Sequence, residues 1–191
     1  MTASPPAPLG ALLAGGAARR MGGDKLCAPL LGRPLALWAL DALLEVCEEV
    51  VVAAKAGTAL PALPADVERL DEPDEPRHPL AGVVAALRHA GPDRDTLVLA
   101  ADLPLVPGSL LRALLAAPAA HAVAVASQRV QPLCARLGAA ALASLEAALR
   151  AEEPATRAVL ALRPAQVEAE AAWLLNVNTA EDLVAAEALL G

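Results

Sequence analysis

Short apolar segments alternate along the chain with longer segments of helical periodicity. The most apolar short segments, Leu9–Leu13, Glu49–Ala54 and Thr96–Ala101, are typical of strands buried in a parallel sheet. The pattern also predicts strands at Val67–Leu70, His121–Ser127, Leu133–Leu137, Gln166–Ala169 and Leu174–Val177. It predicts helices at Pro34–Cys47, Leu80–His89, Ser109–Ala116, Gly138–Ala151, Glu153–Leu162 and Thr179–Leu190. Alternating strands and helices indicate a Rossmann-like three-layer α/β/α sandwich with a mostly parallel sheet.

No internal repeat and no linker-like segment divides this pattern. The 191 residues are enough for one domain with a sizeable core, which we expect to span residues 9–191. Residues 1–8 contain three prolines and small side chains, and we expect them to form a flexible N-terminal tail.

Composition excludes several classes of protein. The formal net charge of -7 and the presence of only two aromatic residues, Trp38 and Trp173, argue against a nucleic-acid-binding protein. No apolar segment is long enough to cross a bilayer, and Leu9–Ala14 is too short for a signal sequence. We therefore expect a cytoplasmic protein that does not associate with a membrane.

The cysteines and histidines do not form a recognisable metal or disulfide pattern. The three cysteines, Cys27, Cys47 and Cys134, are far apart and include no C-x-x-C pair, which fits reduced thiols in the cytosol. The three histidines are also scattered, so we interpret each as a structural or surface residue.

The segment from Leu9 to Lys25, LGALLAGGAARRMGGDK, carries the first chemical signal. It joins a predicted strand to a glycine-rich loop with three basic residues. Glycine lets backbone N–H groups approach a phosphate, and arginine and lysine neutralise its charge. The loop matches neither the dinucleotide fingerprint G-x-G-x-x-G nor the P-loop G-x-x-x-x-G-K-[ST]. A glycine-rich turn with solvated basic residues is the alternative interpretation.

Polar residues follow other predicted strands. Asp71 follows Val67–Leu70, Asp102 follows Thr96–Ala101, and Asn176 and Asn178 precede the last helix. The carboxyl ends of parallel strands share one edge of a sheet, where ligands bind. Asp102 ends an apolar strand, and a Mg²⁺ ion bound to phosphates would compensate its charge. The alternatives are a turn or cap role for Asp102 and the asparagines, and a solvated acidic segment around Asp71.

Motifs along nearly the whole chain resemble the nucleotidyltransferases related to MobA, the molybdenum cofactor guanylyltransferase. LAGGAARRMGGDK resembles the N-terminal signature of that family, and further matching motifs follow in the family's order. These are Asp71, PLAG at Pro79–Gly82, AADLPLVP at Ala100–Pro107, QPLCAR at Gln131–Arg136 and NVNTAEDL at Asn176–Leu183. The LAGG form favours the guanylyl branch, because related cytidylyltransferases more often have LAAG there.

The resemblance implies a fold similar to nucleotide-diphospho-sugar transferases and a reaction. The terminal phosphate of molybdopterin, with or without molybdenum, would attack the α-phosphate of GTP, giving the guanine dinucleotide cofactor and pyrophosphate. It also implies roles for individual residues. Arg20, Lys25 and Asp102 would be catalytic, with Asp102 holding Mg²⁺; Leu13, Ala14, Gly15, Gly16, Lys25, Asp71 and Asp102 would bind the nucleotide; Asn176 and Asn178 would lie on the pterin side or close the site.

Two positions depart from the family pattern, and several alternative functions stay open. The family often has asparagine where this chain has Ala53, and glycine where it has His78. A CTP-dependent molybdopterin cytidylyltransferase or another nucleotidyltransferase is the alternative within the class. A non-catalytic homologue that binds molybdenum cofactor is the alternative outside it. Other cofactor-biosynthesis proteins and molybdoenzyme chaperones are further candidate partners that the resemblance implies.

Overall fold

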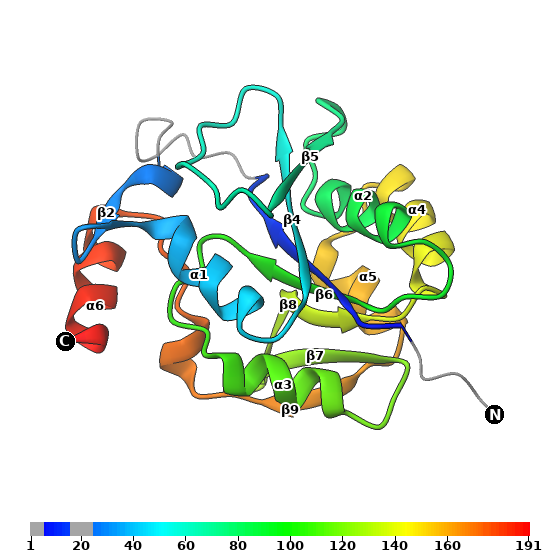
Figure 1. The fold of residues 1–191 in the computed structure, drawn as a ribbon. Coiled ribbons are helices and arrows are strands. Elements are labelled where there is room, and N and C mark those ends of the chain that lie inside the picture. The colour runs from blue at the N-terminus through cyan, green and yellow to red at the C-terminus, as the bar shows by residue number, and fades with distance from the viewer. Residues whose placement is uncertain (1–5, 16–24) are drawn as a thin grey trace.

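A seven-stranded, mostly parallel sheet forms the centre of the molecule in a computed structural model that describes residues 6–15 and 25–191. Its strand order is β5-β4-β1-β6-β8-β7-β9, and β8 runs antiparallel to both of its neighbours. A short antiparallel pair, β2 with β3, lies outside this sheet. Figure 1 shows β1, β4 and β6 running side by side through the middle of the fold.

The elements have the following bounds. The strands are β1 (Leu9–Leu13), β2 (Pro29–Leu30), β3 (Arg33–Pro34), β4 (Glu49–Lys55), β5 (Glu68–Glu72), β6 (Thr96–Ala100), β7 (His121–Ala126), β8 (Arg129–Leu137) and β9 (Ala165–Glu168). The α-helices are α1 (Leu35–Leu44), α2 (Leu80–Ala90), α3 (Gly108–Ala116), α4 (Ala141–Arg150), α5 (Ala155–Ala161) and α6 (Ala180–Leu190). Among the described residues, short 3₁₀ helices span Lys25–Cys27 and Ala171–Leu174.

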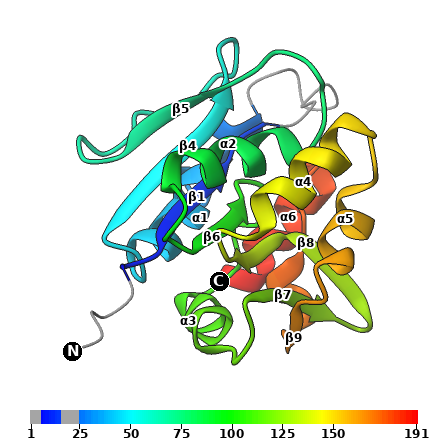
Figure 2. The same cartoon turned by 90° about the vertical axis from the view of Figure 1, so that its right-hand side faces the viewer.

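Helices cover both faces of the sheet because successive strand residues alternate between the faces. Leu12 packs on one face with residues of α1 and α3, whereas Leu13 packs on the other with residues of α2, α4 and α5. Figures 1 and 2 show these two helical layers on opposite sides of the strands. The predicted three-layer α/β/α sandwich with a mostly parallel sheet is therefore confirmed.

Most predicted elements are confirmed, with two informative differences. The segment Leu174–Val177 is not a strand: Leu174 ends a 3₁₀ helix, and Val177 packs with Leu30 and Leu35 in a small core. Strand β5 ends at Glu72 rather than near Leu70, because its pairing with β4 extends to Lys55. The structure describes only residues 6–8 of the expected N-terminal tail; residues 1–5 lie outside it.

Helix α6 begins as the sequence predicts. Thr179 accepts a hydrogen bond from the backbone N–H of Asp182, and the Asp182 carboxylate accepts one from the Thr179 N–H, which together form a capping box. Within the described residues, none of the helices has the length and apolar character needed to cross a membrane.

Candidate active site

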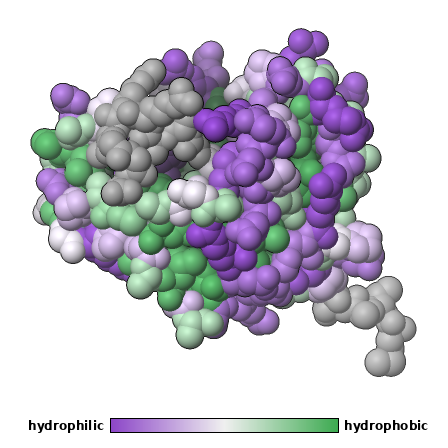
Figure 3. Space-filling view, turned by 90° about the horizontal axis from the view of Figure 1, so that it is seen from above, coloured by the Kyte–Doolittle hydropathy of each residue, from purple (hydrophilic) through white to green (hydrophobic). Residues whose placement is uncertain are grey.

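The carboxyl ends of β1, β4 and β6 meet at one edge of the sheet. The Ala14 N–H donates to the Ala53 carbonyl at 2.8 Å, and the Ala101 N–H donates to the Leu13 carbonyl at 3.0 Å. The chain leaving β1 is thereby held on both sides up to the start of the glycine-rich segment. Figure 3 views the molecule from the side toward which these strands run and shows many hydrophilic residues there.

Lys25 lies at this edge and contacts two residues that are distant in sequence. Its Nζ donates to Asp102 Oδ2 at 2.9 Å and to Asn178 Oδ1 at 2.8 Å. The Lys25 side chain is 8% exposed and that of Asp102 is 28% exposed. An ion pair in so little solvent is screened weakly, so its charges act strongly on a bound anion or cation. The structure thus brings together Lys25, Asp102 and Asn178, as the sequence predicts for one site.

Asn178 is fixed by its backbone neighbours. The Val177 N–H donates to the Asp102 carbonyl at 2.9 Å, which joins this segment to the end of β6. The Asn178 N–H donates to Asp182 Oδ2 at 2.9 Å. This bond is the main reason that the pKa of Asp182 lies below its ordinary value. Val177 is fully buried, whereas Asn176 and Asn178 on either side of it are exposed.

Asn176 has a different partner from Asn178. Its Oδ1 accepts a hydrogen bond from Gln131 Nε2 of β8 at 3.3 Å. Gln131 begins the QPLCAR motif, so two motifs distant in sequence meet here. Asn178 thus contacts Lys25, and Asn176 contacts the antiparallel strand β8.

The acidic residues at the end of β5 point in different directions. The Asp71 side chain is 74% exposed and pairs with Arg69 Nε at 3.2 Å. Glu72 is only 7% exposed and packs against Gly15 and Gly82. Burial raises the pKa of Glu72, and the charge of Lys55 opposes that shift. The sequence analysis missed Glu72. A predicted strand extended by two residues beyond Leu70 would have identified it, because side chains alternate between the two faces of a strand and Glu72 then lies on the inward face.

Gly16 and Arg20, which the resemblance assigns to the nucleotide, lie outside the described residues, as does Arg19. The structure also places the two residues that depart from the family pattern. Ala53 contributes its carbonyl to the end of β1, and its side chain is buried against the α2 side of the sheet. His78 accepts a hydrogen bond from the Leu80 N–H through Nδ1 at 3.1 Å, and so caps the start of α2.

Two buried cysteines are unsuited to catalysis, and one histidine lies away from the site. Burial raises the pKa of the Cys47 thiol to about 11 and that of Cys134 to about 12, so neither forms a nucleophilic thiolate near neutral pH. His121 accepts a hydrogen bond from the Gly138 N–H at the opposite end of the sheet. In residues 6–15 and 25–191, no group of three or more His, Cys, Asp or Glu side chains is arranged to hold a metal ion alone.

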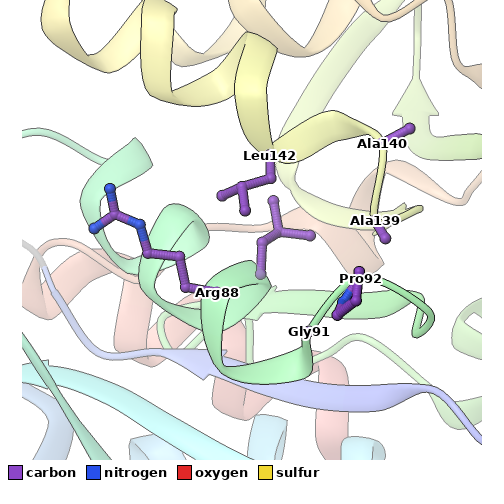
Figure 4. A pocket seen from close by; sticks show the side chains of 7 residues that line it. Arg88, Gly91, Pro92, Ala139, Ala140 and Leu142 are labelled. Atoms are coloured by element: carbon purple, nitrogen blue, oxygen red, sulfur yellow. The ribbon is translucent and has the colours of Figure 1, made fainter.

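A crevice between the end of α2 and the start of α4 lies away from this site (Figure 4). It is lined by Leu87, Arg88, Gly91, Pro92, Ala139, Ala140 and Leu142. These residues lie near the amino end of β6, whereas Asp102 follows its carboxyl end. The crevice also has few polar groups, so it does not suit a triphosphate.

Comparison with known proteins gives consistent matches. The family model described as the MobA-like NTP transferase domain matches residues 10–169. A molybdenum cofactor guanylyltransferase of Cereibacter sphaeroides is 40% identical, over 95% of this chain and 96% of the relative. One of Rhodopseudomonas palustris (strain HaA2) is 34% identical, over 98% of this chain and 94% of the relative.

Solved structures share the fold. Molybdopterin-guanine dinucleotide biosynthesis protein A from Archaeoglobus fulgidus superposes with a TM-score of 0.73 at 24% identity, covering 95% of this chain and 98% of its own. The 2-C-methyl-D-erythritol 4-phosphate cytidylyltransferase from Thermus thermophilus gives a TM-score of 0.70 at 25% identity, covering 95% of this chain and 98% of its own. Since the second neighbour is named a cytidylyltransferase, the shared fold alone does not select the nucleotide.

Proposed function

Because the chain belongs to the MobA-like NTP transferase family, we propose that it transfers GMP from GTP to the terminal phosphate of molybdopterin, with or without bound molybdenum. An oxygen of that phosphate forms a bond to the α-phosphorus of GTP. The bond between the α-phosphorus and the oxygen bridging to the β-phosphate breaks, and pyrophosphate leaves. The names of the curated relatives support GTP as the nucleotide.

One observation carries this proposal: a nearly buried lysine paired with an aspartate at the carboxyl edge of the sheet. Lys25 Nζ is 2.9 Å from Asp102 Oδ2, beside the chain that leaves β1. A triphosphate bound along the glycine-rich segment would meet the Lys25 ammonium. We assign Lys25 to the β- and γ-phosphates, where it stabilises the charge that develops on pyrophosphate. Backbone contacts to the nucleotide would come from Leu13, Ala14 and Gly15. The family resemblance adds Gly16 and Arg20 to the residues that we assign to the nucleotide.

The donor set suits Mg²⁺ delivered with the nucleotide. Asp102 supplies one carboxylate, and the described residues hold no acidic cluster that would bind a metal without phosphate oxygens. Mg²⁺ commonly takes one or two carboxylates, with phosphate oxygens and waters completing its shell. Asp102 would hold the ion, which when bound neutralises phosphate charge.

This reaction needs no protein nucleophile and no general base. The attacking phosphate of the acceptor is already ionised at neutral pH, so the protein has to orient two anionic substrates and neutralise their charge. That requirement fits a site built from Lys25, Asp102 and asparagines, with both buried thiols left unreactive. We assign Asn176 and its partner Gln131 to the acceptor side.

On the basis of the family resemblance, the proposal also includes a cytoplasmic location. Other cofactor-biosynthesis proteins and molybdoenzyme chaperones are proposed as further partners. A CTP-dependent enzyme and a non-catalytic cofactor-binding homologue are the competing functions. The Lys25–Asp102 pair favours an enzyme over a binding module, because binding a cofactor alone does not require both a lysine for a triphosphate and a carboxylate for its metal.

The test supplies purified protein with Mg²⁺, molybdopterin and either GTP or CTP, and measures pyrophosphate release. We expect release with GTP that depends on molybdopterin. Faster release with CTP would overturn the guanylyl assignment. Nucleotide binding without turnover on either nucleotide would establish a binding protein instead.

A further inference from the structure

Glu72 is a buried carboxylate at the nucleotide edge that lacks a partner among the described residues. It is 7% exposed, and within residues 6–15 and 25–191 no side chain or backbone group donates a hydrogen bond to it. Lys55, whose charge acts on Glu72, donates instead to the carbonyls of Pro73 and Asp74, each at 2.7 Å. A carboxylate with so little contact with water and no donor among the described residues suits a ligand that supplies donors.

Two glycines from separate family motifs make room for this carboxylate. A Cβ atom at Gly15, in the LAGG segment, would lie 2.5 Å from Glu72 Oε2. A Cβ atom at Gly82, in the PLAG segment, would lie 3.1 Å from Glu72 Cδ. The carboxylate therefore fills a notch between the end of β1 and the first turn of α2. The positive end of the α2 dipole lies beside it and favours its ionised form.

We propose that Glu72 reads the base of the nucleotide by accepting hydrogen bonds from N1–H and N2–H of guanine. An ionised carboxylate accepts two parallel hydrogen bonds and donates none. Guanine is the common base that presents two adjacent N–H donors on its Watson–Crick edge. Cytosine presents one amino group beside an acceptor nitrogen, which a carboxylate repels. Glu72 would thus select GTP over CTP, a choice that the fold alone leaves open.

This inference rests on the proposed function, and its chemistry differs from that of Asp71, the acid that the sequence singles out. Asp71 points to solvent and pairs with Arg69, whereas Glu72 faces Gly15. Glu68, an exposed glutamate at the other end of β5, supplies a matched control. The buried carboxyl group has a raised pKa in the free protein, and two donors from guanine would return it to the ionised form.

The experiment measures binding of GTP, ITP and dGTP by calorimetry to the wild-type protein and to the variants Glu72→Gln and Glu68→Gln. Inosine lacks the N2 amino group, and dGTP lacks the ribose 2′-hydroxyl, the other donor that a carboxylate accepts. We expect wild-type protein to bind GTP at least about tenfold more tightly than ITP, and dGTP nearly as tightly as GTP. Glu72→Gln should lose that preference, whereas Glu68→Gln should keep it.

Several outcomes would overturn the assignment. GTP binding by Glu72→Gln at wild-type affinity would remove Glu72 from the base site. If the wild-type protein binds dGTP weakly and Glu72→Gln binds dGTP as tightly as GTP, the carboxylate contacts the ribose instead of the base. Equal binding of GTP and ITP by the wild-type protein would also refute the assignment, and this result does not depend on the folding of the variant. A wild-type preference for CTP would instead refute the proposed function, so the two failures are distinguishable.

Discussion

Lys25 Nζ and Asp102 Oδ2 lie 2.9 Å apart although 77 residues separate them in the chain. The lysine begins the short helix after the glycine-rich segment, and the aspartate follows the apolar strand β6. Each charge offsets the desolvation of the other, so the pair is stable without a substrate. A metal–triphosphate complex needs a cation for its phosphates and a carboxylate for its metal, so we interpret the pair as a preformed site for that complex.

Replacing Lys25 by methionine should weaken GTP binding by at least about tenfold, because a charged hydrogen bond to the triphosphate is lost. Binding of guanosine, which has no phosphates, should change little. Calorimetry with both ligands checks the difference. Arg88→Met, on the far end of α2, is the control and should bind GTP as the wild-type protein does. An equal loss for GTP and guanosine would indicate general damage to the site rather than loss of a phosphate contact.

Replacing Asp102 by asparagine keeps a similar shape and an acceptor for Lys25 but removes the negative charge. We expect binding of Mn²⁺ in the presence of GTP to weaken strongly and turnover to fall by about 100-fold or more, because charge stabilisation of phosphoryl transfer depends on the metal. Electron paramagnetic resonance of bound Mn²⁺ checks the first effect, and pyrophosphate release checks the second. Unchanged Mn²⁺ binding with an intact fold would remove Asp102 as the metal ligand.

The sequence predicts the architecture well because strand and helix periodicity are local signals. The segment Leu9–Leu13 is recognisable from its apolar run, and the capping box of α6 from the spacing of Thr179 and Asp182. The site is predicted less completely, because contacts such as Lys25 with Asn178 depend on packing between distant segments. Glu72 was missed for the same reason: its burial depends on where β5 stops pairing with β4.

The two asparagines should affect different substrates. Asn178 accepts from Lys25 at 2.8 Å, so Asn178→Ala should raise the KM for GTP, by about fivefold for the loss of one hydrogen bond near 1 kcal/mol. Asn176 contacts Gln131 at 3.3 Å, so Asn176→Ala should raise the KM for molybdopterin by a similar factor. Steady-state kinetics with each substrate varied in turn measure both constants. The reverse pattern would contradict the division of the site into a nucleotide side and an acceptor side.

Glu72 should make the free protein less stable as the pH rises. Burial raises its pKa above the ordinary value of 4.5, so between 4.5 and the raised value the folded state holds the proton more tightly than the unfolded chain does. Stability from this group is therefore fully present below pH 4.5 and is lost as the pH rises through the folded-state pKa. Glu72→Gln is neutral at every pH and should avoid that loss. Urea denaturation between about pH 4 and pH 8 should show the free energy of unfolding of the variant gaining on that of the wild-type protein as the pH rises. Two profiles that stay parallel over this range would show that Glu72 carries no buried charge.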